Sequence, residues 1–445
     1  MLTREQAQKI VEKILSYSKF PDCEVNLLEP EEAFVRFANN GITTSGISTE
    51  RSIDIRSTRD GRSGSTTITT LDDAALKAAV ARTEEIAAIT PPNPEDVEPL
   101  GPQNYPQLDK FDPETAAART PAMIPHVKAI IDRAMEKKLV AAGFFTRTTS
   151  VAAVGNKLGR FGYHRSADAR LSTTVRRPDG SSSGWDSQPS RHVAQINGVA
   201  LAERAIDKCL QWDKPRRLDP GKYTVVLEPT ATADLVRLLA GFFRGSSFSA
   251  RAVEEGRSFL SKKGGGSSLD EKLFPESITL RTDPFEPSLP ASPWSGDLPA
   301  RKMTWIEKGV VKNLVYDRYW AAKTKKEPTP GTSSLILEGG GASLEDLIAA
   351  TPRGLLVTRF WYIRSLNPQT VQYTGLTRDG LFLIENGKVT APVMNFRFNE
   401  SSVRLLQNTK RLGRTVRVQG SEGASMMAPA LQADEFNFSS VSDAV

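Results

Sequence analysis

The sequence contains few of the side chains that most often bind metals or form disulfides. Its 445 residues include three histidines, His126, His164 and His192, and two cysteines, Cys23 and Cys209. No two histidines have the spacing of an HExxH zinc helix, and the cysteines lie far apart without a partner motif. The composition therefore argues against a disulfide framework, predicts reduced, buried thiols, and leaves no evident set of metal ligands.

Long hydrophobic runs are also missing. No apolar stretch reaches the ~18–20 residues that a membrane-spanning helix needs. The first residues, MLTREQAQKIVEKIL, form an amphipathic pattern and lack the apolar core and small-residue cleavage site of a signal peptide. Hydrophobic residues make up 39% and charged residues 25% of the chain, which is typical of a globular protein. We therefore expect a cytoplasmic protein without membrane contact.

Positive charge is present in only mild excess. The formal net charge is +6 and the pI about 9.1, with Lys and Arg spread along the chain. One modest cluster, NTKRLGRTVRV at residues 408–418, alternates in the manner of a solvated strand face. No helix-turn-helix, zinc-finger or aromatic-basic signature is present, so we do not expect nucleic acid as a partner.

The hydrophobic patterns predict an α+β fold in two domains, because the length exceeds that of one typical core. Residues 1–211 mix strand and helix patterns and predict a mixed sheet with helices. Residues 212–445 predict a large, mostly antiparallel sheet that could curl towards a barrel. Between the first two helical patterns and the next, residues 90–108 carry six prolines, which predicts an extended, ordered or semi-rigid connector.

Local signals place several elements. Thr3 and Gln6 have the spacing of a capping box, and a second helix at 71–89 can be capped by Asp72 or Asp73. Helices are also predicted at 113–138 and 200–210. The pair Asp60-Gly61 predicts a hairpin turn. Two similar hairpins are predicted at 305–316 and 383–394, the second with Asn386-Gly387 as its turn.

A strand-like YTVVLEP is followed by an apolar helical pattern over residues 231–243 and then by the polar loop RGSSFSA. This layout often carries chemistry. A zinc peptidase helix would need imidazole ligands and a carboxylate that takes a proton from the metal-bound water. After Asp234 the only charged side chain of this helix is Arg237. The pattern therefore indicates either a core helix or the helix of a former active site that lacks its ligands and its catalytic base.

Other kinds of chemistry find little support. His164 and Asp168 stand four residues apart, but in a predicted strand or turn, which disfavours a metal role. The glycine runs KKGGGSS at 262–268 and EGGGAS at 338–343 lack the GxxxxGK[ST] spacing, and the second is better explained as a turn before a helix capped by Ser343. Serines follow the apolar helix at Ser246, Ser247 and Ser249, without a GxSxG elbow.

The order of the segments resembles the TldD/PmbA family, formerly called modulators of DNA gyrase. The resemblance covers nearly the whole chain and is carried by four stretches: RSIDIRSTRDGRSGSTTITTLDDAAL, VAAVGNKLG, YTVVLEPTATADLVRLLAGFF and RGLLVTRFWYIRSLNPQTVQYTGLTRDGLFLIENGKVTAPVMNFRFNES. It implies a relation to zinc metallopeptidases that carry HExxxH on a helix and a cysteine near the C-terminus as a third ligand.

Laid on this sequence, the helix motif falls on Arg237, Leu238 and Phe242, and the late cysteine falls at Gln419. All four working positions are replaced, so the resemblance implies no catalytic residue and no metal or other cofactor in this chain. It points to the PmbA (TldE) branch, whose members pair with a zinc-containing TldD-type subunit. The implied role is a pseudoenzyme subunit that helps to enclose unfolded or precursor peptides during proteolysis and peptide maturation.

Two further interpretations remain open from the sequence. The chain could be a stand-alone homodimer that binds peptides or another small ligand without cutting them. It could also be an enzyme that uses serines and one of the three histidines. A neighbouring paralogue with an intact HExxxH motif would favour the heterodimer over the homodimer.

Overall fold

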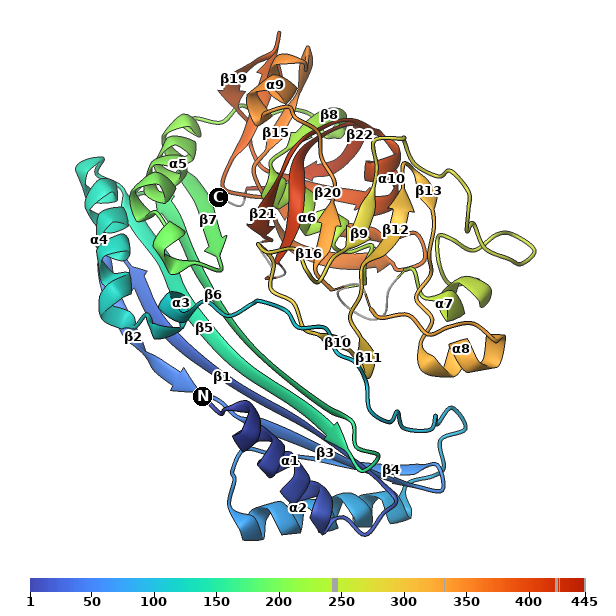
Figure 1. Cartoon of the computed structure of the whole chain (residues 1–445). Coiled ribbons are helices and arrows are strands. Elements are labelled where there is room, and N and C mark those ends of the chain that lie inside the picture. The colour runs from blue at the N-terminus through green and yellow to red at the C-terminus, as the bar shows by residue number, and fades with distance from the viewer. Residues whose placement is uncertain (242–246, 332, 421–422, 424, 444–445) are drawn as a thin grey trace.

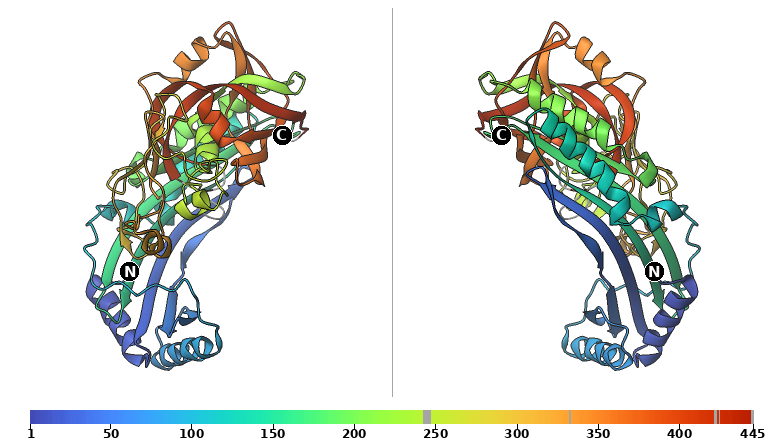
Figure 2. Two further views of the ribbon diagram at one scale, coloured as in Figure 1. Left: turned by 90° about the vertical axis from the view of Figure 1, so that its right-hand side faces the viewer. Right: turned by 90° about the vertical axis from the view of Figure 1, so that its left-hand side faces the viewer.

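The computed structural model describes residues 1–241, 247–331, 333–420, 423 and 425–443. The chain has an α+β fold built on two large sheets, as the patterns predicted (Figure 1). A long, curved sheet with helices on one side forms the N-terminal part, and a rounder body of strands packs against its upper end (Figures 1 and 2). No helix in the described ranges has the length and apolar character needed to cross a membrane.

The N-terminal sheet has the strand order β4-β3-β1-β5-β6-β7, with β2 also paired to β1. Its pairs are antiparallel. Strands β1, β5 and β6 are long enough to run the length of the sheet in Figure 1. The bounds are β1 Asp22–Ala38, β2 Gly41–Thr49, β3 Ser52–Arg59, β4 Arg62–Ile68, β5 Val140–Asn156, β6 Phe161–Arg176 and β7 Ser183–Ser190.

One face of this sheet is covered by four helices. Alternate residues of β1 point to that face, and they contribute to two hydrophobic clusters. Helices α1 (Arg4–Tyr17) and α2 (Asp73–Ile89) pack on the lower end, and α4 (Thr120–Glu136) and α5 (Gly198–Gln211) pack on the upper end (Figure 1). The period-2 alternation of the strands therefore decides which residues become core.

The predicted caps and turns of this half are confirmed. Thr3 and Gln6 form the capping box of α1, and Asp72 rather than Asp73 caps α2. Asp60 and Gly61 both have positive φ, 52° and 69°, between the paired ends of β3 and β4. This is the backbone that a type I′ turn needs. Cys23 and Cys209 are free and fully buried, as expected.

The single helix predicted at 113–138 is wrong. The structure has a short α3 (Pro113–Ala117), two extended residues at 118–119, and then α4. Pro121 has no N–H to donate to the carbonyl of residue 117, and its ring would meet that carbonyl in a continuous helix. The chain therefore stops and restarts with Pro121 in the first turn of α4.

Gly64 marks the closest approach between α2 and the sheet. A Cβ atom placed there would lie 2.1 Å from the Thr83 carbonyl oxygen and 2.7 Å from the Ala87 nitrogen, both helix backbone atoms. We expect Gly64→Ala to lower the free energy of unfolding by about 1–3 kcal/mol, because the helix must move away from β4. Urea unfolding measures this. Gly341→Ala is the control, since a Cβ there meets nothing within 4 Å, and an equal loss in both variants would contradict the packing argument.

The C-terminal part is a mostly antiparallel sheet of thirteen strands. Its main path is β13-β12-β9-β14-β22-β8-β15-β18-β19, while β16, β17, β20 and β21 branch from it. Over the described residues the sheet curls around a buried helix, α6 (Pro229–Val236), without closing into a barrel (Figure 1). The largest hydrophobic cluster lies between this helix and the sheet, with Trp305 fully buried in it.

The remaining bounds complete the C-terminal part. Its sheet strands are β8 Gly221–Leu227, β9 Leu280–Thr282, β12 Met303–Glu307, β13 Val310–Val311, β14 Leu335–Leu337, β15 Arg353–Val357, β16 Phe360–Asn367, β17 Gln372–Thr377, β18 Leu381–Glu385, β19 Lys388–Pro392, β20 Phe396–Ser401, β21 Thr409–Gln419 and β22 Ser425–Val441. Outside the sheet are a small pair, β10 Trp294–Ser295 with β11 Leu298–Pro299, and the helices α7 Ala250–Glu254, α8 Arg318–Thr324, α9 Leu344–Ala349 and α10 Ser402–Gln407.

Both predicted hairpins of this half are confirmed. β12 and β13 are joined through Lys308-Gly309, and β18 and β19 through Asn386-Gly387, with positive φ at all four residues. Ser343 caps α9 in a capping box, so EGGGAS is a turn before a helix, as expected.

The proline-rich connector runs as an extended strap between the two parts (Figure 1). The Tyr105 hydroxyl donates to the Asp297 carbonyl oxygen at 3.0 Å, and its ring lies 5.3 Å from that of Trp294. Glu95 forms an ion pair with Arg251 at 2.8 Å. The connector is thus ordered by contacts with the C-terminal part. The two large sheets lie on either side of residue 212, and the division into domains at that residue stays a prediction.

Candidate functional site

The helix that the sequence singled out is α6, in the centre of the C-terminal part. It follows β8 through Glu228, with Pro229 in the first turn, and residues 231–236 are all buried. The α-helix ends at Val236, within the predicted span 231–243, whose residues 242 and 243 lie outside the described residues. Hydrogen bonds from residue i+3 to residue i then continue as far as Gly241, which has φ 88°. Such tightened turns are common at helix ends, and a left-handed glycine terminates them.

The four positions that the family resemblance singled out are placed as follows. Leu238 is 1% exposed and belongs to the hydrophobic core, and Arg237 is 4% exposed. Phe242 lies outside the described residues. Gln419 ends β21, and its side-chain amide donates to the Gly423 carbonyl oxygen at 2.7 Å.

The residue after Gln419 faces α6 directly. A Cβ atom on Gly420 would lie 2.5 Å from Asp234 Oδ1 and 3.6 Å from Arg237 Nε. The structure therefore brings the end of β21 against the helix, with residue 420 in contact. The assignment of the family's cysteine position to Gln419 stays a prediction.

Asp234 is a fully buried carboxylate in this otherwise apolar helix. Burial lowers the pKa values of Arg170, in β6, and of Arg359, between β15 and β16, and Asp234 opposes this shift in both. The interaction of Asp234 with these two arginines was not apparent from the sequence, because Arg170 and Arg359 come from distant segments. The only sign of it in the sequence is an acidic residue within an apolar helical run.

Arg359 extends the buried charges to the N-terminal sheet. Its Nη1 donates to Asp379 Oδ2 at 2.9 Å, and its guanidinium lies 4.2 Å from the ring centroid of Trp185. The other oxygen of Asp379 accepts a hydrogen bond from the Ser183 hydroxyl at 2.7 Å. We call Asp234, Arg170, Arg237, Arg359 and Asp379 the arginine cluster.

A zinc ion does not fit the arginine cluster. Arg237 stays charged and would repel a divalent cation, and Leu238 offers no ligand atom and no base. Across the described ranges, no three His, Cys, Asp or Glu side chains lie close enough to hold a metal. Asp168, once considered with His164, forms a bidentate ion pair with Arg417 at 2.8 Å.

The histidines and serines do not form a hydrolytic constellation in the part of the chain that is described. His164 is buried in β6, and burial lowers its pKa to about 4. His126 packs in α4 against Phe145, and His192 Nδ1 lies 3.3 Å from Asp112. Ser249 caps α7, and Ser246 lies outside the described residues.

One cavity lies beside the turns that follow α6. It measures ≈ 890 Å³ and is lined by Leu238 and Gly241, by the segment 247–258, and by residues 363–373. β16 forms one wall. In the sheet β16 pairs with β17. Its pairing shifts twice, and Tyr362 and Leu366 are half-exposed.

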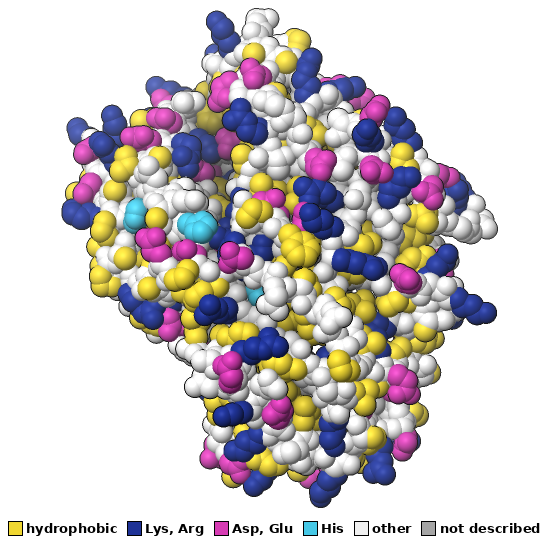
Figure 3. All heavy atoms as spheres, viewed as in Figure 1, with side chains coloured by type: hydrophobic (Ala, Val, Ile, Leu, Met, Phe, Trp, Pro, Cys, Tyr) yellow, Lys and Arg dark blue, Asp and Glu magenta, His cyan; other side chains and the backbone are white. Residues whose placement is uncertain are grey.

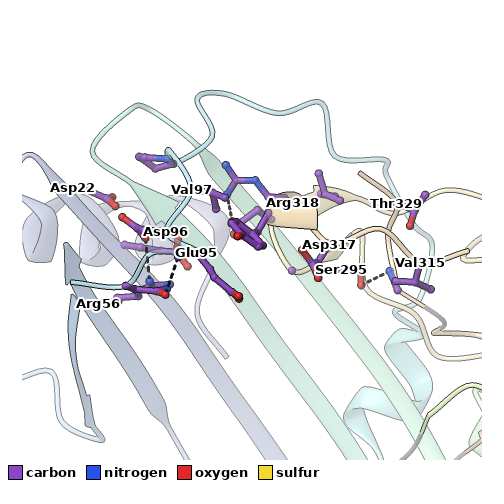
Figure 4. Close-up of a pocket in the computed structure, with 18 residues that line it drawn as sticks. Asp22, Arg56, Glu95, Asp96, Val97, Ser295, Val315, Asp317, Arg318 and Thr329 are labelled. Atoms are coloured by element: carbon purple, nitrogen blue, oxygen red, sulfur yellow. Dashed lines mark hydrogen bonds and ion pairs between the residues drawn. The ribbon is translucent and has the colours of Figure 1, made fainter. Parts of the chain in front are cut away.

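A second cavity, of ≈ 460 Å³, lies where the connector meets the N-terminal sheet, the small β10-β11 pair and the start of α8 (Figure 4). It is rich in carboxylates, but arginines hold most of them. Arg318 pairs with Asp297 at 2.9 Å, and Arg56 lies 3.8 Å from Asp96. Burial raises the pKa of Asp22 on its wall. Arg56 through Asp96, and Arg318 through a hydrogen bond to the Glu98 carbonyl oxygen, fasten the connector, which is a structural role.

Comparison with known proteins agrees with this architecture. The family profile described as the PmbA/TldA metallopeptidase C-terminal domain matches residues 220–440, and that of PmbA/TldA metallopeptidase domain 1 matches residues 23–87. No curated protein matches the sequence.

Solved structures share the fold over nearly the full length. One, described as a candidate modulator of a DNA gyrase from Thermotoga maritima, has a TM-score of 0.84 at 17% identity, covering 97% of this chain and 100% of that chain. TldE from Thermococcus kodakarensis has a TM-score of 0.82 at 21% identity, and the match covers 97% of this chain and 99% of that chain. A candidate modulator of DNA gyrase from Bacteroides thetaiotaomicron has a TM-score of 0.83 at 22% identity, and the match covers 99% of this chain and 100% of that chain. On the two profiles and this fold, the chain belongs to the PmbA/TldD metallopeptidase family.

Proposed function

We propose that this chain is a non-catalytic, TldE-like subunit of a zinc-dependent TldD/TldE-type peptidase complex of the cytoplasm. Its partner is a TldD-type subunit that supplies the zinc, and its ligands are unfolded or precursor peptides. The chain itself contributes part of the enclosing wall and a sheet edge for the peptide.

The arginine cluster carries the non-catalytic part of the proposal. At the helix where family peptidases bind zinc, this chain has the cation Arg237 and the buried Leu238. Arg170 and Arg359 add two further guanidinium groups under the influence of Asp234. A site of this charge supports neither a divalent cation nor a metal-bound water.

The cavity beside β16 supports the peptide-binding part. Its volume of ≈ 890 Å³ and its strand wall suit an extended chain that pairs through backbone donors and acceptors. Such pairing needs only main-chain groups of the ligand, so it tolerates many sequences. Half-exposed Tyr362 and Leu366 give apolar contacts along the same strand.

We expect the purified chain alone to hold no stoichiometric zinc and to leave casein and unfolded peptides uncut. Mixed with a TldD-type subunit, it should enable or enhance a cleavage that a chelator abolishes. Elemental analysis and a peptide-release assay measure these outcomes.

Ser365 lines the cavity on β16. We expect Ser365→Trp to lower the partner-dependent cleavage rate at low peptide concentration at least about tenfold, since a loss of about 1.4 kcal/mol of binding free energy has that effect.

Ser439→Trp is the matched control, because Ser439 is exposed on β22 and does not line this cavity. Cleavage by the isolated chain that resists a chelator would contradict the proposal and favour a serine mechanism. Peptide binding by a homodimer, with no effect on a TldD-type subunit, would favour the stand-alone binding protein.

A further inference from the structure

A third cavity, of ≈ 520 Å³, lies where three segments from different parts of the chain meet. These are the end of the connector at 107–113, residues 191–192 after β7, and the loop 285–287 of the C-terminal part. It is separate from the arginine cluster and from the cavity beside β16, with which it shares no lining residue. We call it the connector cavity.

Lys110 is a buried cation in the wall of the connector cavity. Its side chain is 2% exposed, and its Nζ donates to the Glu286 carbonyl oxygen at 2.5 Å. Burial and, to a smaller extent, the nearby Arg191 lower the pKa of Lys110 to about 8, while Glu286 and Asp283 oppose this shift. The Glu286 carbonyl dipole stabilises a charge less than a counter-ion would, so the charged ammonium of Lys110 is destabilised at this buried position.

Arg191 is a second buried cation in the same wall. It is 6% exposed, and its Nη1 donates to the Pro287 carbonyl oxygen at 2.7 Å. Its buried Nε has no hydrogen-bond partner in the structure. Among the residues that the structure describes, neither Arg191 nor Lys110 has a carboxylate within ion-pair distance. Burial lowers the pKa of Arg191 as well.

The acidic groups around the connector cavity are exposed or engaged elsewhere. Asp109 is exposed, and Asp112 caps α3 and faces His192. Asp168 is held by Arg417, and Asp283 by Arg281 and Lys302. The carboxylate of Glu286 accepts from the Ser288 nitrogen. These carboxylates act on the two buried cations from beyond ion-pair distance, and the hydrogen bonds of Lys110 and Arg191 go to main-chain carbonyl oxygens.

We propose that the connector cavity binds a small oxyanion, a carboxylate or phosphate group, between Lys110 and Arg191. Such a group supplies the missing counter-charge and accepts charge-assisted hydrogen bonds from the ammonium and from Nε of the guanidinium. Because the wall joins the connector, the N-terminal sheet and the C-terminal part, the bound anion fastens the two parts together. On the face shown in Figure 3, Lys and Arg side chains are interspersed with Asp and Glu side chains.

The test is calorimetric titration of the full chain with inorganic phosphate and, separately, with sodium acetate, in sodium chloride of matched ionic strength at pH 7. We expect saturable binding of at least one of the two, and the tighter one identifies the oxyanion. Lys110→Met and Arg191→Met should each weaken binding at least about tenfold, the loss expected for one charge-assisted hydrogen bond.

Lys388→Met is the matched control, since Lys388 is an exposed lysine of β19. It should bind the anion as the parent does. Absence of saturable binding to the parent chain would overturn the proposal without any variant. Equal affinities in the parent, Lys110→Met and Arg191→Met would overturn it too. Neither result depends on peptidase activity, so this proposal can fail while the proposed function stands.

Discussion

Asp234→Asn is expected to lower the free energy of unfolding by about 3–5 kcal/mol, the cost of leaving a buried charge without its partner. Asp234 is fully buried, and its carboxylate opposes the desolvation of Arg170 and Arg359. Asparagine keeps the shape of the side chain and removes the charge. Urea unfolding followed by fluorescence and circular dichroism measures the loss.

Asp132→Asn is the control for Asp234→Asn. Asp132 pairs with Lys128 at 3.0 Å on the surface of α4, with about half of its side chain exposed. A surface pair of this kind contributes about 0–1 kcal/mol. Adding Arg170→Gln to Asp234→Asn should restore part of the lost stability, since it removes one of the uncompensated charges. Similar losses of unfolding free energy in Asp132→Asn and Asp234→Asn would show that the destabilisation does not come from the arginine cluster.

A zinc site is expected to appear when Arg237→His, Leu238→Glu, Phe242→His and Gln419→Cys are combined. Three protein ligands with one open position make a catalytic zinc site. Thiolate and imidazole must be deprotonated to bind, so the affinity should rise from acid to neutral pH. We expect about one zinc per chain and at least a ~100-fold gain in affinity over the parent, since ligand changes of this kind span orders of magnitude. Titration against a competing chelator measures it.

The position of the introduced cysteine decides whether its thiolate reaches α6. Gly420 faces Asp234 and Arg237, whereas the side chain of Gln419 bonds to Gly423. The matched variant therefore carries Gly420→Cys in place of Gln419→Cys. If only this second set binds zinc, the assignment to 419 is off by one residue. If neither set binds while both remain folded, α6 is not the family's metal helix in the assumed register.

Stability losses from Leu238→Glu must be separated from metal binding in these variants. Leu238 is 1% exposed in the largest hydrophobic cluster, so a glutamate there is buried. A buried carboxylate without a partner is costly. Zinc should offset this cost in the quadruple variant, because binding to the folded state stabilises it.

Features that depend on neighbouring residues could be predicted from the sequence. The capping boxes at Thr3 and Ser343 and the turns at Asp60-Gly61 and Asn386-Gly387 each need only a few adjacent side chains and their backbone preferences. The predicted replacement of the family's ligand residues also rests on the sequence, because it concerns residue identities alone.

Where segments meet could not be predicted in the same way. The helix at 113–138 has the right periodicity, but Pro121 divides it. The predicted helix at 231–243 ends at Val236 because its last turns tighten before Gly241. Both are cases in which a backbone restriction overrode an apolar pattern.

The sequence by itself determined the α+β class, the bounds of many elements and the absence of histidine, cysteine and glutamate from the predicted helix, since composition and local spacing carry this information. Only the tertiary structure decided that Asp234 meets Arg170 and Arg359, that β16 lies beside a cavity, and that Lys110 and Arg191 share a wall. These groups come from segments far apart in the chain. Their meeting depends on strand register and domain packing, and a single side chain carries no signal of the distant charge that it will face.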